Sequence, residues 1–252
     1  MKVVTVSFDY ASSDGRYKHL LDVFTYSLKY FGHDVVSLTP PPPPDQIRAR
    51  RFQTSNNYKL SLWIETLKDV QEDCVFCDCD MLCLGKLDDI WREEFDIAYT
   101  VRGDSANVPV NAGVIFARYT KDSIKFLEKW RKIDNAMYLD SQFRAKWAAK
   151  YCGQNQASFG FLLENHPCDI ARLKPVPCKI WNVCDEDWPS IDENARLLHV
   201  KSRLREVVSN HFLPENEAPT LSPAMKLWYS WEVRMQNDKT ISLGSDRSKV
   251  PQ

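Results

Sequence analysis

The feature that most constrains how this chain folds is the apolar segment CVFCDCDMLC at residues 74–83, which carries two aspartates spaced two residues apart. Side chains on an extended strand alternate between its faces, so Asp78 and Asp80 are predicted to share one face and Cys79 to point to the other. Two carboxylates that leave water side by side repel each other, and their desolvation is costly unless a cation lies between them. The segment therefore predicts a strand that presents a pair of acids to a cation.

The chemistry of this acid pair favours a hard divalent ion. Oxygen ligands suit Mg²⁺ or Mn²⁺, which keep coordination positions open for substrate phosphates. The expected cofactor is therefore Mn²⁺ or Mg²⁺, and the expected substrate carries a diphosphate. A strand followed by a solvated acidic turn would show the same Asp-x-Asp pattern, so this alternative stays open on the segment alone.

Four cysteines in the same segment suggest a rival site for zinc or an iron-sulfur cluster. Strand alternation puts Cys77 and Cys79 on one face and Cys74 on the other, while Cys83 follows further along. No second Cys-x-x-Cys pair follows at finger-like spacing. The carboxylate site is therefore the favoured interpretation.

The length and charge of the chain limit the remaining possibilities. Its 252 residues suffice for one α/β domain with a sizeable core. The 33 basic and 34 acidic residues nearly balance, so the overall charge favours neither nucleic acid nor an anionic membrane as partner. No apolar run is long enough for a signal peptide or a membrane span, and the eight cysteines are expected to be free thiols in a reducing compartment. These features predict a cytoplasmic protein from a bacterial, viral or cytosolic eukaryotic setting.

Hydrophobic periodicity along the chain alternates between strand and helix. Besides 74–83, the predicted strands are 2–8, 33–38, 95–101, 110–117 and 195–201. The predicted helices are 17–31, 58–71, two within 120–151, and 224–235. Strand, helix and strand in succession predict a βαβ unit, so the fold class is α/β, with a mostly parallel central sheet flanked by helices. We expect one domain over residues 1–212, and then, over 213–252, a C-terminal helix and a polar tail from 236 that is disordered.

The order of these features is similar to that of a known enzyme family. After the strand with Asp78 and Asp80 come an acid-rich segment at 87–91, a second apolar strand, and the turn Asn111-Ala-Gly113 that opens the next strand. This order resembles the nucleotide-sugar glycosyltransferases of the GT-A fold, such as the glycogenin-like and lipooligosaccharide galactosyltransferase-like enzymes, over residues 1–212. The resemblance implies a single GT-A, Rossmann-like domain. It also implies transfer of a sugar from a nucleoside-diphosphate sugar, expected to be a UDP-sugar, to a hydroxyl of a glycan or protein-linked acceptor.

The resemblance also implies roles for individual residues. The implied metal ligands are Asp78, Asp80 and His199. The implied contacts to the nucleotide sugar come from Asp9, Tyr10, Lys59, Asp78, Asn111, Gly113 and Lys201. If His199 is a ligand, metal-dependent nucleotide binding is expected to weaken as the pH falls through the unperturbed histidine pKa of about 6.5.

The candidate catalytic residues are Asn155, Gln156 and Lys201. The pair Asn155-Gln156 stands where retaining enzymes of the family carry Asp-Gln, so an amide replaces the acid. Retention is favoured, with Gln156 as the weak nucleophile or dipole. Inversion would require a carboxylate base, for which the candidates are Asp185, Glu186 and Asp187.

Two other functions remain open on the sequence. A metal-dependent nucleotidyltransferase shares the sheet and the acids, but it usually carries a glycine-rich loop after its first strand, and residues 9–15 contain one glycine. A non-catalytic sugar-nucleotide-binding or scaffold protein would retain the fold with an altered site, as Asn155 allows.

Overall fold

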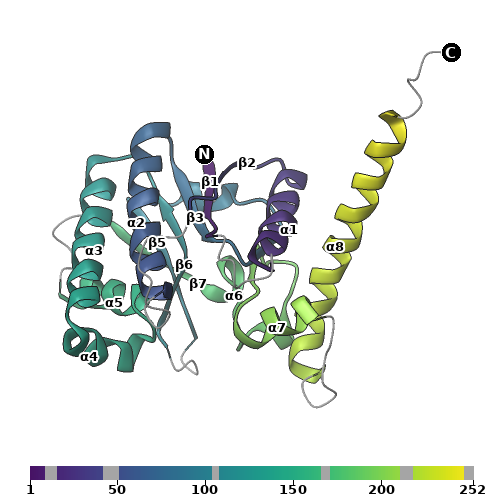
Figure 1. Ribbon diagram of the computed structural model, residues 1–252. Coiled ribbons are helices and arrows are strands. Elements are labelled where there is room, and N and C mark those ends of the chain that lie inside the picture. The colour runs from purple at the N-terminus through teal and green to yellow at the C-terminus, as the bar shows by residue number, and fades with distance from the viewer. Residues whose placement is uncertain (9–15, 42–50, 104–107, 166–170, 211–217, 247–252) are drawn as a thin grey trace.

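The computed structural model describes residues 1–8, 16–41, 51–103, 108–165, 171–210 and 218–246, which form an α/β fold around a six-stranded sheet (Figure 1). The strands of this sheet are β1 (Lys2–Val6), β2 (Asp34–Leu38), β3 (Cys74–Asp78), β5 (Ile97–Val101), β6 (Val110–Ala117) and β7 (Leu173–Pro177). Two short strands, β4 (Met81–Cys83) and β8 (Leu197–His199), pair separately. The helices are α1 (Arg16–Tyr30), α2 (Arg51–Val70), α3 (Lys121–Leu139), α4 (Ser141–Tyr151), α5 (Asn155–Asn165), α6 (Cys178–Trp181), α7 (Ser202–Asn210) and α8 (Ala218–Asp246).

The central sheet is mostly parallel, as predicted. Its strand order is β2-β1-β3-β6-β5-β7, and β6 is antiparallel to both of its neighbours while the other pairs are parallel. All eight residues of β6 are buried, which explains why that segment reads as a continuous apolar run. The βαβ unit formed by β1, α1 and β2 matches the prediction from periodicity.

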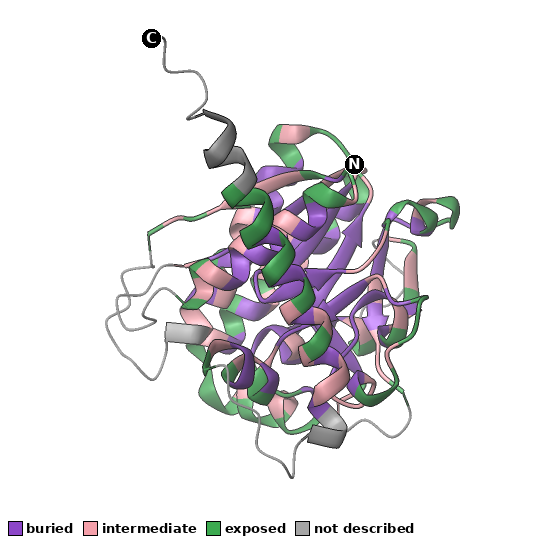
Figure 2. Ribbon diagram, turned by 90° about the vertical axis from the view of Figure 1, so that its right-hand side faces the viewer, coloured by how far each residue is buried: buried purple, intermediate pink, exposed green. Residues whose placement is uncertain are grey.

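Helices cover both faces of the sheet. One face packs against α2, α3 and α5, with Trp63, Trp130 and Phe159 at its centre. The other face packs against α1 through Phe24 and Leu28. Figure 2 shows the buried residues concentrated in the strands and on the inner sides of the helices. Helices α1, α2 and α3 are amphipathic because one side meets the sheet and the other meets water.

The C-terminal ends of β1 and β3 and the N-terminal end of β6 lie at the same edge of the sheet. The parallel strands β1 and β3 both end there, and Cys77 near the end of β3 pairs with Val114 of the antiparallel strand β6. The first residues of β6, which include Asn111 and Gly113, therefore lie beside Asp78. Ligands of open α/β sheets gather at this edge.

Several elements differ from the sequence predictions, among them β7, α6 and α7, which were not predicted. The strand predicted over 74–83 is two strands, because the chain bends at Cys79 and Asp80. Helix α2 begins at Arg51 rather than at 58, and α5 was not predicted. The first turns of α2 are largely polar, and α5 has little contrast between its two sides, so both segments give weak periodicity. Packing against neighbouring helices stabilises them.

The tail that was predicted to be disordered from residue 236 is helical up to residue 246. Helix α8 continues to Asp246, and residues 247–252 lie outside the described part of the chain. Contacts with α1 reach past the expected end of the helix at residue 235, because the Tyr26 hydroxyl donates a hydrogen bond of 2.5 Å to Asp238. Just before that end, Arg234 lies over the Tyr30 ring. The polar composition of residues 236–246 gives no indication of these contacts with α1.

Helix α8 lies against the body of the protein along its first half (Figure 1). Its Trp228 and Trp231 pack in a cluster with residues of α1, α7 and β8. The boundary proposed at residue 212 stays a prediction. In the described part of the chain, none of the helices has the length and apolar character needed to cross a membrane.

Candidate metal and nucleotide site

The two aspartates of the 74–83 segment meet a histidine from a distant part of the chain. His199 Nε2 lies 3.7 Å from Asp78 Oδ2 and 3.5 Å from Asp80 Oδ1. One potential ligand atom from each of the three residues lies within 4.8 Å of the other two. Within the described residues, these three side chains form a group that could bind a metal ion. Asp80 and His199 are buried, whereas Asp78 is half-buried. The three predicted metal ligands are thus brought together.

The bend after β3 and the pairing of β4 with β8 produce this convergence. Met81 pairs with His199 in antiparallel register, and the Val200 N–H donates to the Asp80 carbonyl at 2.8 Å. Strand alternation is not the reason why the aspartates converge, since Cys79 and Asp80 lie outside any strand. Cys79 is buried and lines a cavity beside the two aspartates.

The cysteine alternative finds no support in the described part of the chain. Cys74, Cys77, Cys79 and Cys83 are all free and buried, and none joins the group of potential metal ligands. Burial raises the pKa of each of these thiols, which disfavours the thiolate that a soft metal would require.

The absence of a side chain at Gly113 allows His199 and Asp78 to lie close to the backbone of β6. A Cβ at this position would lie 2.7 Å from His199 Cε1 and 3.0 Å from Asp78 Oδ2. Real Cβ atoms do not approach heavy atoms at the shorter of these distances, so any side chain here must displace the imidazole. The glycine is therefore required by close approach rather than by an unusual backbone angle.

Gly113→Ala is expected to weaken Mn²⁺ binding at least about tenfold, because the imidazole must move away from the carboxylates. Overpacking should also destabilise the fold by about 1–3 kcal/mol. Mn²⁺ titrations and melting curves measure the two effects. Gly103→Ala is the matched control, since nothing lies within 4 Å of its new Cβ. Unchanged Mn²⁺ affinity in folded Gly113→Ala would contradict this account of the site.

Each of the two carboxylates also forms an ion pair with a basic side chain. Lys59 on α2 forms an ion pair with Asp78 and lies 4.8 Å from the centre of the Trp63 ring. Arg205 on α7 forms an ion pair with Asp80, and its Nη1 donates to the Tyr17 hydroxyl at 2.8 Å. Arg205 was missed by the sequence reasoning, and its only signal was a basic side chain in the helix that follows His199. The positive charges of Lys59 and Arg205 therefore offset the negative charges of the two aspartates.

The charges of this cluster shift the protonation of its members. Burial disfavours the Asp80 carboxylate, but the positive charges of His199 and Arg205 hold its pKa below the usual value. Burial alone would lower the pKa of His199, yet the Asp80 carboxylate raises it to about 9. A pKa this far above the usual value favours the protonated form of His199 at neutral pH.

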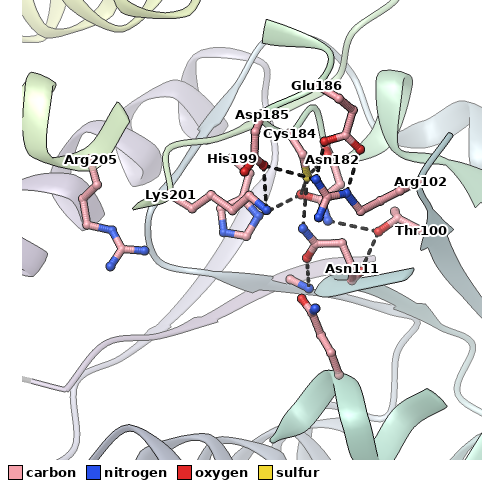
Figure 3. A network of polar contacts seen from close by, with 12 residues as sticks. Thr100, Arg102, Asn111, Asn182, Cys184, Asp185, Glu186, His199, Lys201 and Arg205 are labelled. Atoms are coloured by element: carbon pink, nitrogen blue, oxygen red, sulfur yellow. Dashed lines mark hydrogen bonds and ion pairs between the residues drawn. The ribbon is translucent and has the colours of Figure 1, made fainter. Parts of the chain in front are cut away.

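A chain of hydrogen bonds fixes the ring of His199 (Figure 3). Its Nδ1 lies 3.1 Å from Asn182 Oδ1, while Asn182 Nδ2 donates to Thr100 Oγ1 at 3.0 Å. Since Asn182 thereby presents an acceptor to the ring, Nδ1 carries a proton and Nε2 faces the carboxylates. Asn111, predicted to approach the donor sugar, is buried instead. Its Nδ2 donates to Cys184 Sγ at 3.0 Å, and its Oδ1 accepts from the Gly113 N–H at 2.9 Å.

The acidic segment 185–187 carries two carboxylates that form ion pairs with basic side chains. Lys201 Nζ lies 2.7 Å from Asp185 Oδ1, and Arg102 makes a two-pronged contact with Glu186 (Figure 3). Burial opposes these charges, but the cations outweigh it and lower the pKa of both Asp185 and Glu186. Burial raises the pKa of the third acid, Asp187.

Two cavities adjoin the group of potential metal ligands. The first, of about 260 Å³, is lined by the end of β1, by Tyr17 and by the first half of α2. The second, of about 490 Å³, is lined by Gly113, Asp185, Lys201 and residues 152–156, which comprise the turn before α5 and the first two residues of that helix. Both cavities share Asn56, Lys59, Asp78, His199 and Arg205 as lining residues.

Most predicted site residues thus fall around one cleft. Asn155 and Gln156 line the second cavity, together with Gln154, which was not predicted. Asp9 and Tyr10 lie outside the described residues, although Phe8, just before them, lines the first cavity. The cleft is therefore built from several segments that are far apart in the sequence.

Solved glycosyltransferases have a similar fold. A glycosyltransferase involved in the glycosylation of the major capsid of PBCV-1 superposes with a TM-score of 0.60 at 11% identity, covering 82% of this chain and 97% of that one. Two structures of the glycosyltransferase GlyE of Streptococcus pneumoniae TIGR4, one of them an apo form, give TM-scores of 0.56 and 0.57 at 13% identity. These matches cover 96% of this chain but 64% and 63% of the pneumococcal chains, so this chain spans less than two thirds of their length.

These likenesses define the fold class. No known protein-family profile and no curated protein sequence matches the chain. At these identities the similarity of structure shows the fold, which is the α/β fold of glycosyltransferases with its mostly parallel sheet.

Proposed function

We propose that the protein is a metal-dependent glycosyltransferase of the GT-A type. In this proposal it transfers a sugar from a UDP-sugar to a hydroxyl of a glycan or protein-linked acceptor, with retention of the anomeric configuration. The observation that carries the proposal is the Asp78, Asp80 and His199 group, which lies where two cavities meet at the carboxyl edge of a glycosyltransferase-like sheet. A diphosphate at that junction would extend a nucleoside into one cavity and a sugar into the other.

The donor atoms at the junction fit a divalent ion. Two carboxylates and one neutral imidazole provide hard and intermediate ligands, which suit Mn²⁺ and, less well, Mg²⁺. A divalent ion held there would neutralise negative charge on the departing diphosphate. The close approach at Gly113 and the cations now facing both acids support a site adapted to a bound positive charge.

Lys59 and Arg205 are the proposed phosphate ligands. Each pairs with one of the carboxylates and lines both cavities. Once a metal ion takes over the carboxylates, the two cations become available to phosphate oxygens at the same junction. Lys201, predicted for this role, is held by Asp185, so its contact with the diphosphate requires that ion pair to open.

The proposed reaction breaks the bond between the anomeric carbon and the diphosphate oxygen. The acceptor oxygen forms the new glycosidic bond, and its proton leaves with the diphosphate or with solvent. Retention is supported by the ion pairs of Asp185 and Glu186, because a carboxylate held by Arg102 or Lys201 is a weak base. Asn155 and Gln156 face the second cavity and remain the proposed polar groups beside the reacting carbon.

The direct test incubates the wild-type protein with Mn²⁺ and individual UDP-sugars. We expect release of free UDP that stops when EDTA removes the metal, and NMR of any glycoside formed should show the anomeric configuration of the donor. Pyrophosphate release from a nucleoside triphosphate and a sugar phosphate would instead identify a nucleotidyltransferase. Tight donor binding without turnover across a panel of sugar acceptors would favour a non-catalytic protein.

A further inference from the structure

Gln154 lies in the wall of the second cavity with one half of its side-chain amide unpaired. The side chain is 3% exposed, and its Oε1 has no hydrogen-bond partner among the described residues. Asn155 Oδ1, next to it, is likewise buried and unpaired. Buried acceptors of this kind are costly to leave without a donor. Two of them in adjacent residues of one cavity wall point to a ligand that donates hydrogen bonds.

Asp134 on α3 fixes the orientation of the Gln154 amide. Its carboxylate accepts hydrogen bonds from Gln154 Nε2 at 2.9 Å, from Ser158 Oγ at 2.7 Å and from Asn57 Nδ2 at 3.0 Å. A carboxylate offers only acceptors, so the NH₂ group of Gln154 must face Asp134 and Oε1 must face away from it. The exposed fraction of Asp134 is 0%, so bulk solvent does not compete with these donors.

The same carboxylate joins the two walls of the cavity. Asn57 belongs to α2, which carries the lining residues Asn56 and Lys59, while Gln154 lies just before α5. A second link crosses the same gap, because Asn155 Nδ2 donates to the Asn56 carbonyl at 3.4 Å. Movement of either wall therefore changes the position of the Gln154 amide.

The turn that carries Gln154 is strained. Cys152 has a φ of 58° and a ψ of 139°, a combination that costs a residue with a side chain, and Gly153 follows with a φ of 67°. Both residues line the same cavity. Strain and unpaired acceptors thus coincide within the four residues 152–155, which line a cavity shared with Asp78 and His199.

We propose that Gln154 accepts a hydrogen bond from a hydroxyl of the transferred sugar and that Asp134 is the positioning residue that aims its carbonyl oxygen. This inference rests on the proposed function, because it assigns a sugar to the second cavity. An amide oxygen can only accept, and a sugar ring carries several hydroxyl donors. The oxygen is shielded from solvent in the structure, so the turn shifts when the sugar enters, and the strain at Cys152 reduces the cost of that shift.

The test separates recognition of the sugar from recognition of the nucleotide. Calorimetry with Mn²⁺ gives Kd for UDP, UDP-glucose, UDP-galactose and UDP-N-acetylglucosamine, and the ratio of the UDP value to the tightest value is the sugar contribution. In Gln154→Met we expect the Kd of UDP to stay within about twofold while the sugar contribution falls about tenfold. Asp134→Asn, which allows the amide to turn over, should reduce the sugar contribution in the same direction. Gln142→Met is the matched control, since Gln142 is exposed on α4 and should change neither value.

Deoxy donors extend the test to the wild-type protein and remove any dependence on folding of the variants. One monodeoxy analogue of the tightest donor should lose the same factor as Gln154→Met, and it should lose nothing further in that variant. Unchanged sugar contributions in both folded variants, or equal binding of every monodeoxy donor, would overturn the assignment of Gln154. A wild-type protein that binds UDP no better with Mn²⁺ than without it would instead overturn the proposed function.

Discussion

Asp80→Asn is expected to reduce Mn²⁺ affinity about a hundredfold or more and to abolish Mn²⁺-dependent binding of UDP. Asp80 supplies a buried carboxylate that faces both His199 and Arg205. Asparagine keeps the shape of the side chain but removes the negative charge that offsets a divalent ion. The loss of charge also leaves two buried cations without their partner, so the melting temperature should fall as well. Mn²⁺ titration followed by electron paramagnetic resonance, with calorimetry for UDP, measures the binding effects.

Asp69→Asn is the matched control for this experiment, because Asp69 is an exposed acid near the end of α2. It should leave both Mn²⁺ affinity and UDP binding unchanged. If Asp80→Asn stays folded and still binds Mn²⁺ as the wild type does, the metal does not use this carboxylate and the assignment of the site is wrong.

Mn²⁺ affinity of the wild-type protein is expected to rise about tenfold per pH unit from pH 6.5 to 8.5 and to level off near pH 9. The imidazole of His199 binds a metal only when neutral, and Asp80 raises its pKa to about 9. Each metal ion therefore displaces one proton below that pH. The structure moves the expected window upward from the unperturbed pKa near 6.5, because the sequence could not reveal that a carboxylate lies 3.5 Å away.

His199→Gln should bind Mn²⁺ weakly and with little dependence on pH in the same range. His19→Gln is the control, since His19 pairs with Glu232 of α8 and lies outside both cavities. A wild-type affinity that is flat between pH 6.5 and 8.5 would exclude His199 as the displaced base.

The raised pKa of His199 also makes a prediction for stability without metal. A group with a folded-state pKa above its unfolded value stabilises the fold fully below the unfolded value, about 6.5, and loses that contribution as the pH rises through the folded value. The melting temperature of the metal-free protein should therefore fall as the pH rises from about 6.5 to 9. Mn²⁺ should offset more of this loss at the upper end of the range.

Much of the fold follows from local patterns in the sequence. The buried run of β6 and the amphipathic stripe of α1 are visible in the spacing of apolar residues, since a strand or helix with one or two covered faces must carry that spacing. Elements that depend on contacts rather than on periodicity were missed or cut short. Helix α5 is apolar nearly all round and α8 is held by Tyr26, Tyr30 and other residues of α1, so neither boundary is encoded within its own segment.

The candidate site divides in the same way. Asp78, Asp80 and His199 were predicted from motif and resemblance, and the structure brings them together. Arg205 and Gln154 were not predicted, because nothing in their neighbours distinguishes them from ordinary surface residues of a helix or turn. Both became candidates only through contacts with residues more than 15 positions away in the chain.

The sequence by itself determined the alternation of strands and helices and the presence of the acid pair, since these depend on residue type and short spacing. Tertiary structure alone decided which charges face one another. The bend at Asp80 and the pairing of Met81 with His199 put an imidazole beside two carboxylates, and that proximity sets its pKa. Electrostatic interactions fall off with distance in space and not with distance along the chain, so protonation, the orientation of the Gln154 amide and the division of the cleft into two cavities require the folded arrangement.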